Sequence, residues 1–289
     1  MSPLSTTAFD VQHALLENGL TQAELFEYVF DDTALALSFV LNIALAGFTI
    51  LGIAYLGRNL TDPRAKIIAI SLMLISVVSI SSYSGLTSGL TLSIIEMPAG
   101  HPAEGTTTAG EDGVLTMWGR YLTWTFSTPF ILIALGMIAG SNWTKILTTV
   151  AFTIAMCVTG LAAALTTSSL AMRWWWFVIS SLFFLVIVYI ILVEWDADAK
   201  QTGTSDLFNT LKLLTVVGWF GYPILWFLGV EGIAVLDVAF TSWGYSILDI
   251  ITKYIVTILI MLYVAKEPET ITAGEEYGSS LPGFVPADD

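Results

Sequence analysis

WWWFVISSLFFLVIVYIILV, residues 174–193, is an almost wholly apolar stretch without a charged side chain. About 20 apolar residues suffice to cross the hydrocarbon of a membrane as one helix. With Arg173 this stretch forms the fifth of seven such segments, the others being residues 34–57, 67–91, 116–140, 144–167, 211–230 and 241–264. The sequence therefore predicts an all-α membrane protein, a bundle of seven transmembrane helices over residues 34–264. An N-terminal segment, 1–33, and a tail, 265–289, flank it.

Composition agrees with one polytopic membrane domain. Of 289 residues, 55% are hydrophobic and only 12% charged, too few for the surface of a soluble domain of that length. The net charge of −14 argues against nucleic-acid binding and suits a salt-rich setting, where screening shortens charge repulsion. Cys157 is the single cysteine, so no intrachain disulfide can form.

Basic residues beside the predicted spans indicate how the chain crosses the membrane. Loops rich in Lys and Arg face the cytoplasm. One set of loops and ends contains Arg58, Arg64, Lys66, Lys145, Lys200, Lys212 and Lys266, whereas the other set has Arg173. We therefore expect a multi-pass cell-membrane protein with its N-terminus outside and its C-terminus, a mobile polar tail, in the cytoplasm. The long outer connection around residues 96–114 is rich in turn formers and predicts a loop or a short hairpin.

Asp249 and Lys253 are the clearest ionisable pair inside a predicted span, in SILDIITKYIV (residues 246–256). Charges there are costly and are usually paired or functional. Four residues apart on a helix, the two side chains share one face. One interpretation is an ion pair that only fixes helix packing. The other is a lysine that forms a Schiff base with an aldehyde cofactor, with Asp249 as its counterion.

Aromatic residues recur at helical spacing in span six, at Trp219, Tyr222 and Trp226, and span three contains Trp124. Each alone is most simply explained by ordinary packing or by an interfacial belt. Together with a lysine in the next span, they could form the walls of a flat, elongated apolar cofactor site.

Span three also places polar groups on one face, since Arg120, Thr123 and Ser127 follow at spacings of three and four, and Ala134 continues that face. A membrane Thr or Ser most often bonds back to a carbonyl of the preceding turn. These hydroxyls therefore become candidate ligands only when considered beside Arg120 and the Asp249–Lys253 pair.

At this point the sequence resembles the microbial rhodopsins, and among them the archaeal halorhodopsins. The matching segments are RYLTWTFSTP (120–129), CVTGLAAALTTSS (157–169), LTVVGWFGYPILW (214–226), WGYSILDIITKY (243–254) and EMPAGH (96–101). The resemblance implies all-trans retinal bound covalently to Lys253 as a Schiff base, with Asp249 as counterion. It further implies a pocket lined by Trp124, Met156, Gly160, Trp219, Tyr222 and Trp226.

The resemblance also indicates the ion. Proton-pumping relatives place carboxylates at the positions of Thr123 and Ala134, and an acid at Thr241 in addition to Glu231; this chain lacks them. The protonated Schiff base at Lys253 and Arg120 supply two positive charges and Asp249 one negative charge. One buried charge remains, so we expect chloride, or another monovalent anion, at Thr123 and Ser127.

The expected function is a light-driven inward chloride pump, not an enzyme. The anion would leave the bundle near Thr215 and Lys212, with Ala134 along the way, and the resemblance makes a homotrimer the expected assembly. Two rivals remain open: a light sensor of this fold that signals through a membrane partner, and a seven-helix transporter or receptor without retinal. Ser76, Thr153 and Phe177 depart from the family pattern and leave colour and isomer ratio open.

Overall fold

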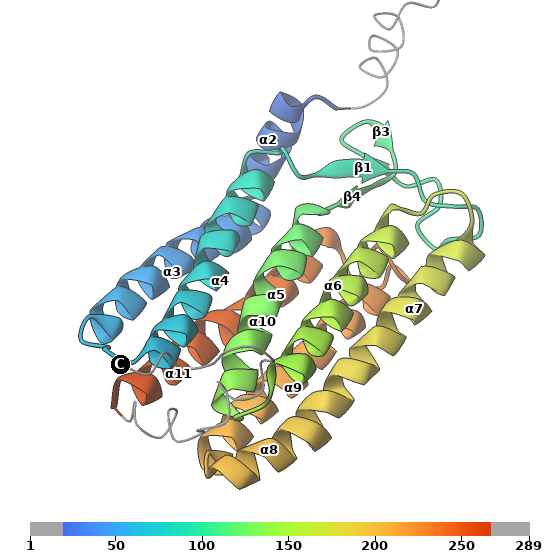
Figure 1. The fold of residues 1–289 in the computed structure, drawn as a ribbon. Coiled ribbons are helices and arrows are strands. Elements are labelled where there is room, and N and C mark those ends of the chain that lie inside the picture. Colours follow the sequence, from blue (N-terminus) through green and yellow to red (C-terminus); the bar gives the residue numbers. More distant parts are fainter. Residues whose placement is uncertain (1–19, 267–289) are drawn as a thin grey trace, which may run out of the picture.

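Seven long apolar helices form a single bundle in the computed structural model, which describes residues 20–266 (Figure 1). Each of these helices is long and apolar enough to cross a membrane, as the sequence predicted. They are α3 (Thr33–Gly57), α4 (Pro63–Thr87), α5 (Gly119–Ile138), α6 (Trp143–Leu165), α7 with its continuation (Leu170–Thr202), α9 (Ser205–Leu228) and α10 with its continuation (Val238–Lys266).

Two of the spans contain a π-helical turn and run further than predicted. The fifth comprises α7 (Leu170–Tyr189), the π turn η1 (Ile190–Glu194) and α8 (Trp195–Thr202). The seventh comprises α10 (Val238–Asp249), the π turn η2 (Ile250–Ile255) and α11 (Val256–Lys266). A π turn inside an α-helix is uncommon and frequently occurs at functional sites. Lys253 lies inside η2.

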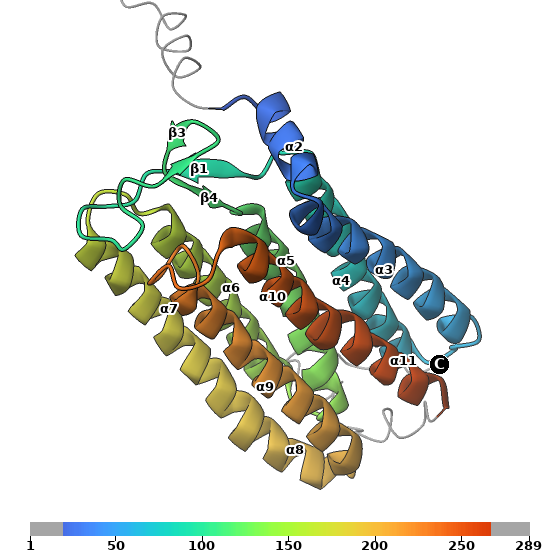
Figure 2. The same cartoon turned by 180° about the vertical axis from the view of Figure 1, so that it is seen from behind.

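Short strands cover one end of the bundle. Strand β1 (Ser93–Ile95) pairs antiparallel with β4 (Val114–Thr116), and β2 (Thr107–Thr108) with β3 (Glu111–Asp112). The prediction of a loop or short hairpin here is confirmed. We call this the hairpin end and the opposite one, which carries α8, the α8 end (Figures 1 and 2).

The sequence predicted that the second span extends to residue 91, but α4 ends at Thr87. Gly89 then turns the chain with a φ of 74°. A Cβ on Gly89 would lie 2.8 Å from Gln22 O and Phe26 N, so only glycine fits against the helix that packs there.

That neighbouring helix, α2 (Gln22–Asp31), lies in the segment 1–33 that the sequence analysis left without structure. Thr21 and Glu24 form a capping box at its start, and Leu25 and Val29 are buried against the α3–α4 side of the bundle. The T-Q-A-E spacing was a signal in the sequence that could have predicted this helix. The predicted mobile tail lies outside the described residues, apart from its first two.

Helix α5 is the most buried of the seven spans and carries Arg120, Thr123 and Ser127 into the interior. Towards the α8 end its neighbours form a continuous apolar core that includes Leu135, Ile146 and Trp195. Polar groups on α5 therefore lie between this apolar core and the hairpin end.

The close packing of α5 predicts that bulk at Gly136 destabilises the fold. A Cβ there would lie 2.7 Å from Ile146 Cγ1, whereas a Cβ at Gly47 in α3 would meet nothing within 4 Å. Gly136→Val should cost about 1–3 kcal/mol, a typical value for overpacking, and lower the thermal unfolding temperature. Gly47→Val is the matched control and should unfold near the wild-type temperature. Equal unfolding temperatures for the two variants would contradict this account.

Candidate functional site

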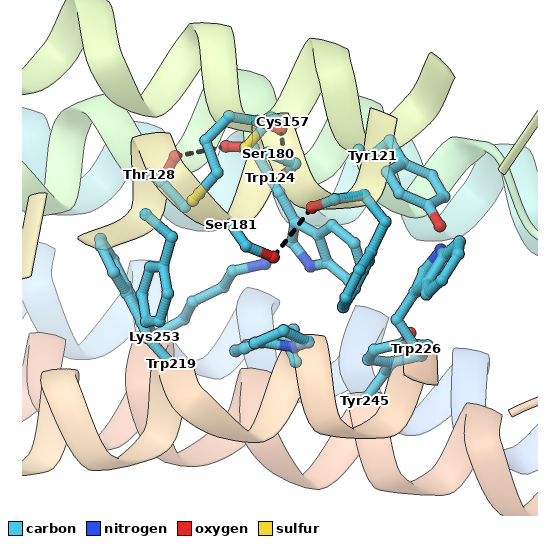
Figure 3. A pocket seen from close by; sticks show the side chains of 16 residues that line it. Tyr121, Trp124, Thr128, Cys157, Ser180, Ser181, Trp219, Trp226, Tyr245 and Lys253 are labelled. Carbon is cyan, nitrogen blue, oxygen red and sulfur yellow. Dashed lines mark hydrogen bonds between the residues drawn. The ribbon is translucent and has the colours of Figure 1, made fainter. Parts of the chain in front are cut away.

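The interior contains a mainly apolar cavity between the helices (Figure 3). Its walls come mainly from α5, α6, α7, α9 and α10. The lining residues are Tyr121, Trp124, Thr128, Met156, Cys157, Gly160, Phe177, Ser180, Ser181, Phe184, Trp219, Tyr222, Pro223, Trp226, Tyr245 and Lys253.

Aromatic rings make up much of the wall. Trp124 packs edge-on against Tyr222 and Tyr245, each at 5.2 Å between ring centroids. Phe177 stacks on Trp226 at 4.5 Å. The six pocket residues expected from the sequence all line this one cavity.

Lys253 is the only lysine among the described lining residues, and Figure 3 shows its side chain reaching into the cavity. Its Nζ lies 2.9 Å from Asp249 Oδ2, and both side chains are 1% exposed. Tyr83 donates to Asp249 Oδ2 at 2.7 Å and Tyr222 donates to Oδ1 at 2.6 Å. The carboxylate is thus held by one ammonium and two hydroxyls, which offset much of the cost of burying it. The shared face expected from the i, i+4 spacing is present.

Arg120 lies in the first turn of α5, 2% exposed. One terminal nitrogen donates to Tyr83 OH at 3.1 Å, and the other donates to Ser242. Within residues 20–266 it forms no ion pair, and its Nε has no hydrogen-bond partner. Tyr83 consequently links Arg120 to Asp249 through one hydroxyl.

The two predicted hydroxyl ligands differ in their contacts. Thr123 Oγ1 donates to Gly119 O at 3.0 Å, the back-bonding that is common in membrane helices, and lies in contact with the Ser82 hydroxyl. Ser127 Oγ is buried and has no hydrogen-bond partner among residues 20–266. Ser82, which itself donates to Gly119 O at 2.7 Å, is a member of this group that the sequence analysis missed.

At the hairpin end, Glu231 lies in the connection between α9 and α10 and accepts a hydrogen bond from Tyr121 OH at 2.7 Å. Burial raises the pKa of its carboxyl, and the Tyr121 hydrogen bond and the charge of Arg173 act against that rise. Arg173 is held by backbone carbonyls, including Glu231 O at 2.8 Å. Within residues 20–266 the two side chains form no ion pair, so the charge of Arg173 acts on the Glu231 carboxyl without a direct contact.

The residues expected on the exit path lie apart from the cavity, at the α8 end. Lys212 forms an ion pair with Asp196, which also pairs with Lys200 at 2.6 Å. Thr215, one turn along α9, is fully buried and its hydroxyl has no partner. Ala134 belongs to the apolar core on α5. The sequence analysis did not foresee Asp196 as the partner of Lys212.

Residues 33–267 match the family described as bacteriorhodopsin-like protein. The chain belongs to this family, among its halorhodopsins. It is 60% identical to halorhodopsin of Natronomonas pharaonis over 95% of each chain, and 55% identical to that of Halorubrum sodomense over 93% and 94%.

Solved halorhodopsins share the architecture. The structure titled "Halorhodopsin, a light-driven chloride pump" matches with a TM-score of 0.79 and 46% identity, covering 83% of this chain and 98% of that one. A bromide-bound halorhodopsin from Halobacterium salinarum matches with a TM-score of 0.78 and 45% identity, covering 84% and 98%. The resemblance that the motifs indicated is confirmed.

Membership of a rhodopsin family implies a retinal chromophore. The cavity fits such a group, because a narrow space walled by aromatic rings suits a flat polyene and a single amine reaches into it.

The buried Glu231 predicts a pH-dependent contribution to stability. Because its folded-state pKa is raised, the folded state retains a proton that the unfolded chain loses above the ordinary value of 4.5. Stability is therefore lost as the pH rises from 4.5 towards the raised pKa. Glu231→Gln cannot ionise, so its unfolding temperature should fall less than that of the wild type across this interval. Glu27→Gln, at an exposed position of α2, is the control; identical pH profiles for Glu231→Gln and wild type would refute the assignment.

Proposed function

We propose that this protein is a light-driven pump that carries chloride into the cell. The observation that supports this most directly is a buried positive charge without a counterion. Lys253 is matched by Asp249, whereas Arg120 forms no ion pair within the described part of the chain. An unpaired buried ion costs several kcal/mol, so a small anion beside these groups stabilises the folded protein.

Retinal would be held by Lys253 through a covalent Schiff base, and Trp124, Met156, Gly160, Trp219, Tyr222 and Trp226 would enclose it. Bound there, it supplies the light-driven isomerisation that turns the Schiff-base N–H from one side to the other. Asp249 compensates the charge at the lysine nitrogen. Tyr83 and Tyr222 donate hydrogen bonds to its two oxygens and hold the carboxylate in place beside the lysine.

The anion site we propose consists of Arg120, Thr123 and Ser127, beside Asp249 and Lys253. Arg120 Nε and Ser127 Oγ are buried donors without acceptors, and chloride is an acceptor. Thr123 would contribute by turning its hydroxyl away from Gly119 O, to which Ser82 also donates. Neither Thr123 nor Ala134 offers a carboxylate that could relay a proton.

Release would follow at the α8 end, past Ala134 towards Thr215 and Lys212. The Thr215 hydroxyl is an unused buried donor, and Lys212 is a cation whose charge is masked by Asp196. Because Asp196 also pairs with the exposed Lys200, it can shift to that partner when an anion reaches Lys212. This end would face the cytoplasm and the hairpin end the exterior, in accord with the distribution of basic loops. A homotrimer remains a prediction from the family.

Attachment of retinal at Lys253 is directly testable. Purified Lys253→Ala should remain colourless after addition of all-trans retinal, because no other lysine reaches the cavity within residues 20–266. Lys200→Ala, at an exposed position, should form the normal visible band. The measurement is the absorption spectrum before and after hydroxylamine. A wild-type band at Lys253→Ala would show that another group carries the chromophore.

The direction and the ion can be tested in illuminated cells suspended in unbuffered chloride. Inward anion flow makes the interior negative, so protons should enter passively and uptake should persist or grow with a protonophore. Each chloride moved against 100 mV stores about 2.3 kcal/mol. Thr123→Val and Ser127→Ala should raise the chloride concentration needed for half-maximal flux, whereas Ser81→Ala, at an exposed serine of α4, should not.

Acidification of the medium that a protonophore abolishes would indicate an outward proton pump. A flux unchanged when a large non-binding anion replaces chloride would likewise contradict the proposal. Absence of any light-driven flux from a coloured protein would favour the light sensor.

A further inference from the structure

Within residues 20–266, the side chain of Arg120 donates hydrogen bonds only to uncharged groups. One of these groups belongs to Ser242, which is not part of the anion site proposed above. Nη2 of Arg120 donates to Ser242 Oγ at 2.7 Å and to Ser242 O at 3.2 Å. Nη1 of Arg120 donates to Tyr83 OH. Ser242, on α10, is fully buried and holds the guanidinium through both its side chain and its backbone.

A third helix fixes the direction of these hydrogen bonds. Ser38 on α3 donates its hydroxyl proton to Leu35 O at 2.7 Å, and its oxygen lies 2.7 Å from Ser242 Oγ. With the Ser38 proton on Leu35 O, the Ser242 hydroxyl donates to Ser38 and accepts from Arg120, which as a guanidinium can only donate. In the series Arg120, Ser242, Ser38 and Leu35 O, each group then donates a hydrogen bond to the next. Hydrogen bonds that run in one direction strengthen one another.

The anchor orients Arg120 without neutralising it. An aspartate or glutamate at position 242 would also hold the guanidinium, but as an ion pair that cancels its charge. A serine supplies an acceptor of similar reach with no charge. The surplus positive charge of the site therefore depends on what stands at position 242 as well as on Arg120 itself.

We propose that Ser242, supported by Ser38, is a positioning residue that orients Arg120 while leaving its charge available, and that it thereby sets the affinity for the transported anion. This inference rests on the chloride site proposed above. A purely structural role would be to join α3, α5 and α10. Ser246 provides the comparison, because its buried hydroxyl also links α10 to α3, donating to Ser38 O at 2.9 Å without touching Arg120.

The test is the chloride titration of the visible band in purified, retinal-loaded protein, together with the rise in unfolding temperature that chloride produces. A hydrogen bond to a charged group is stronger than one between neutral groups. Ser242→Ala should therefore raise the chloride dissociation constant by about tenfold or more. Ser242→Thr retains the hydroxyl and should stay within about threefold of wild type. Ser242→Asp should form a pigment whose band and unfolding temperature no longer respond to chloride, because the introduced carboxylate replaces the anion.

The control Ser246→Ala should bind chloride as the wild type does. Equal affinities of Ser242→Ala and wild type, or equal losses in Ser242→Ala and Ser246→Ala, would overturn the proposal. If Ser242→Asp yields no pigment, Ser38→Ala decides: it removes the acceptor for the Ser242 proton and should weaken chloride binding, and an unchanged titration would refute the relay. A wild type that does not respond to chloride would instead refute the proposed chloride site itself.

Discussion

The ion pair between Lys253 and Asp249 is the interaction on which the rest of the interior depends. Both groups are buried, and neither could remain charged there alone without a penalty of several kcal/mol. Asp249 recruits hydroxyls from α4 and α9, through Tyr83 and Tyr222, so one carboxylate ties three helices together. The same carboxylate fixes the lysine nitrogen at the margin of the aromatic cavity.

Tyr83 extends that interaction to a second cation. Its hydroxyl donates to Asp249 and accepts from Arg120, so the two positive groups share one carboxylate, Lys253 directly and Arg120 through a neutral bridge. This keeps Arg120 in place without a full ion pair. The α8 end differs, because there Asp196 forms ion pairs with both Lys200 and Lys212.

Features that repeat along one helix were predictable from the sequence, and features that depend on how two helices face each other were not. The i, i+4 pair of Asp249 and Lys253 and the aromatic stripe of α9 follow from helical spacing alone. Ser82, Ser242 and Tyr245 gained importance only when α4 and α10 were set against α5, since isolated polar side chains in a span resemble background. The π turns also escaped prediction, because no residue type marks them.

The position of η2 suggests why one helix can serve as both anchor and moving part. A π turn replaces the regular i to i−4 hydrogen bonds by i to i−5 ones, so the backbone at Lys253 departs from a continuous α-helix. Asp249 lies in the regular helix just before that turn and is held by two tyrosines. If the nitrogen of Lys253 moves on isomerisation while the two tyrosines hold Asp249, the positive charge would shift relative to its counterion. A mobile anion near that charge would respond to the shift, and the neutral anchor on Arg120 would keep it within reach.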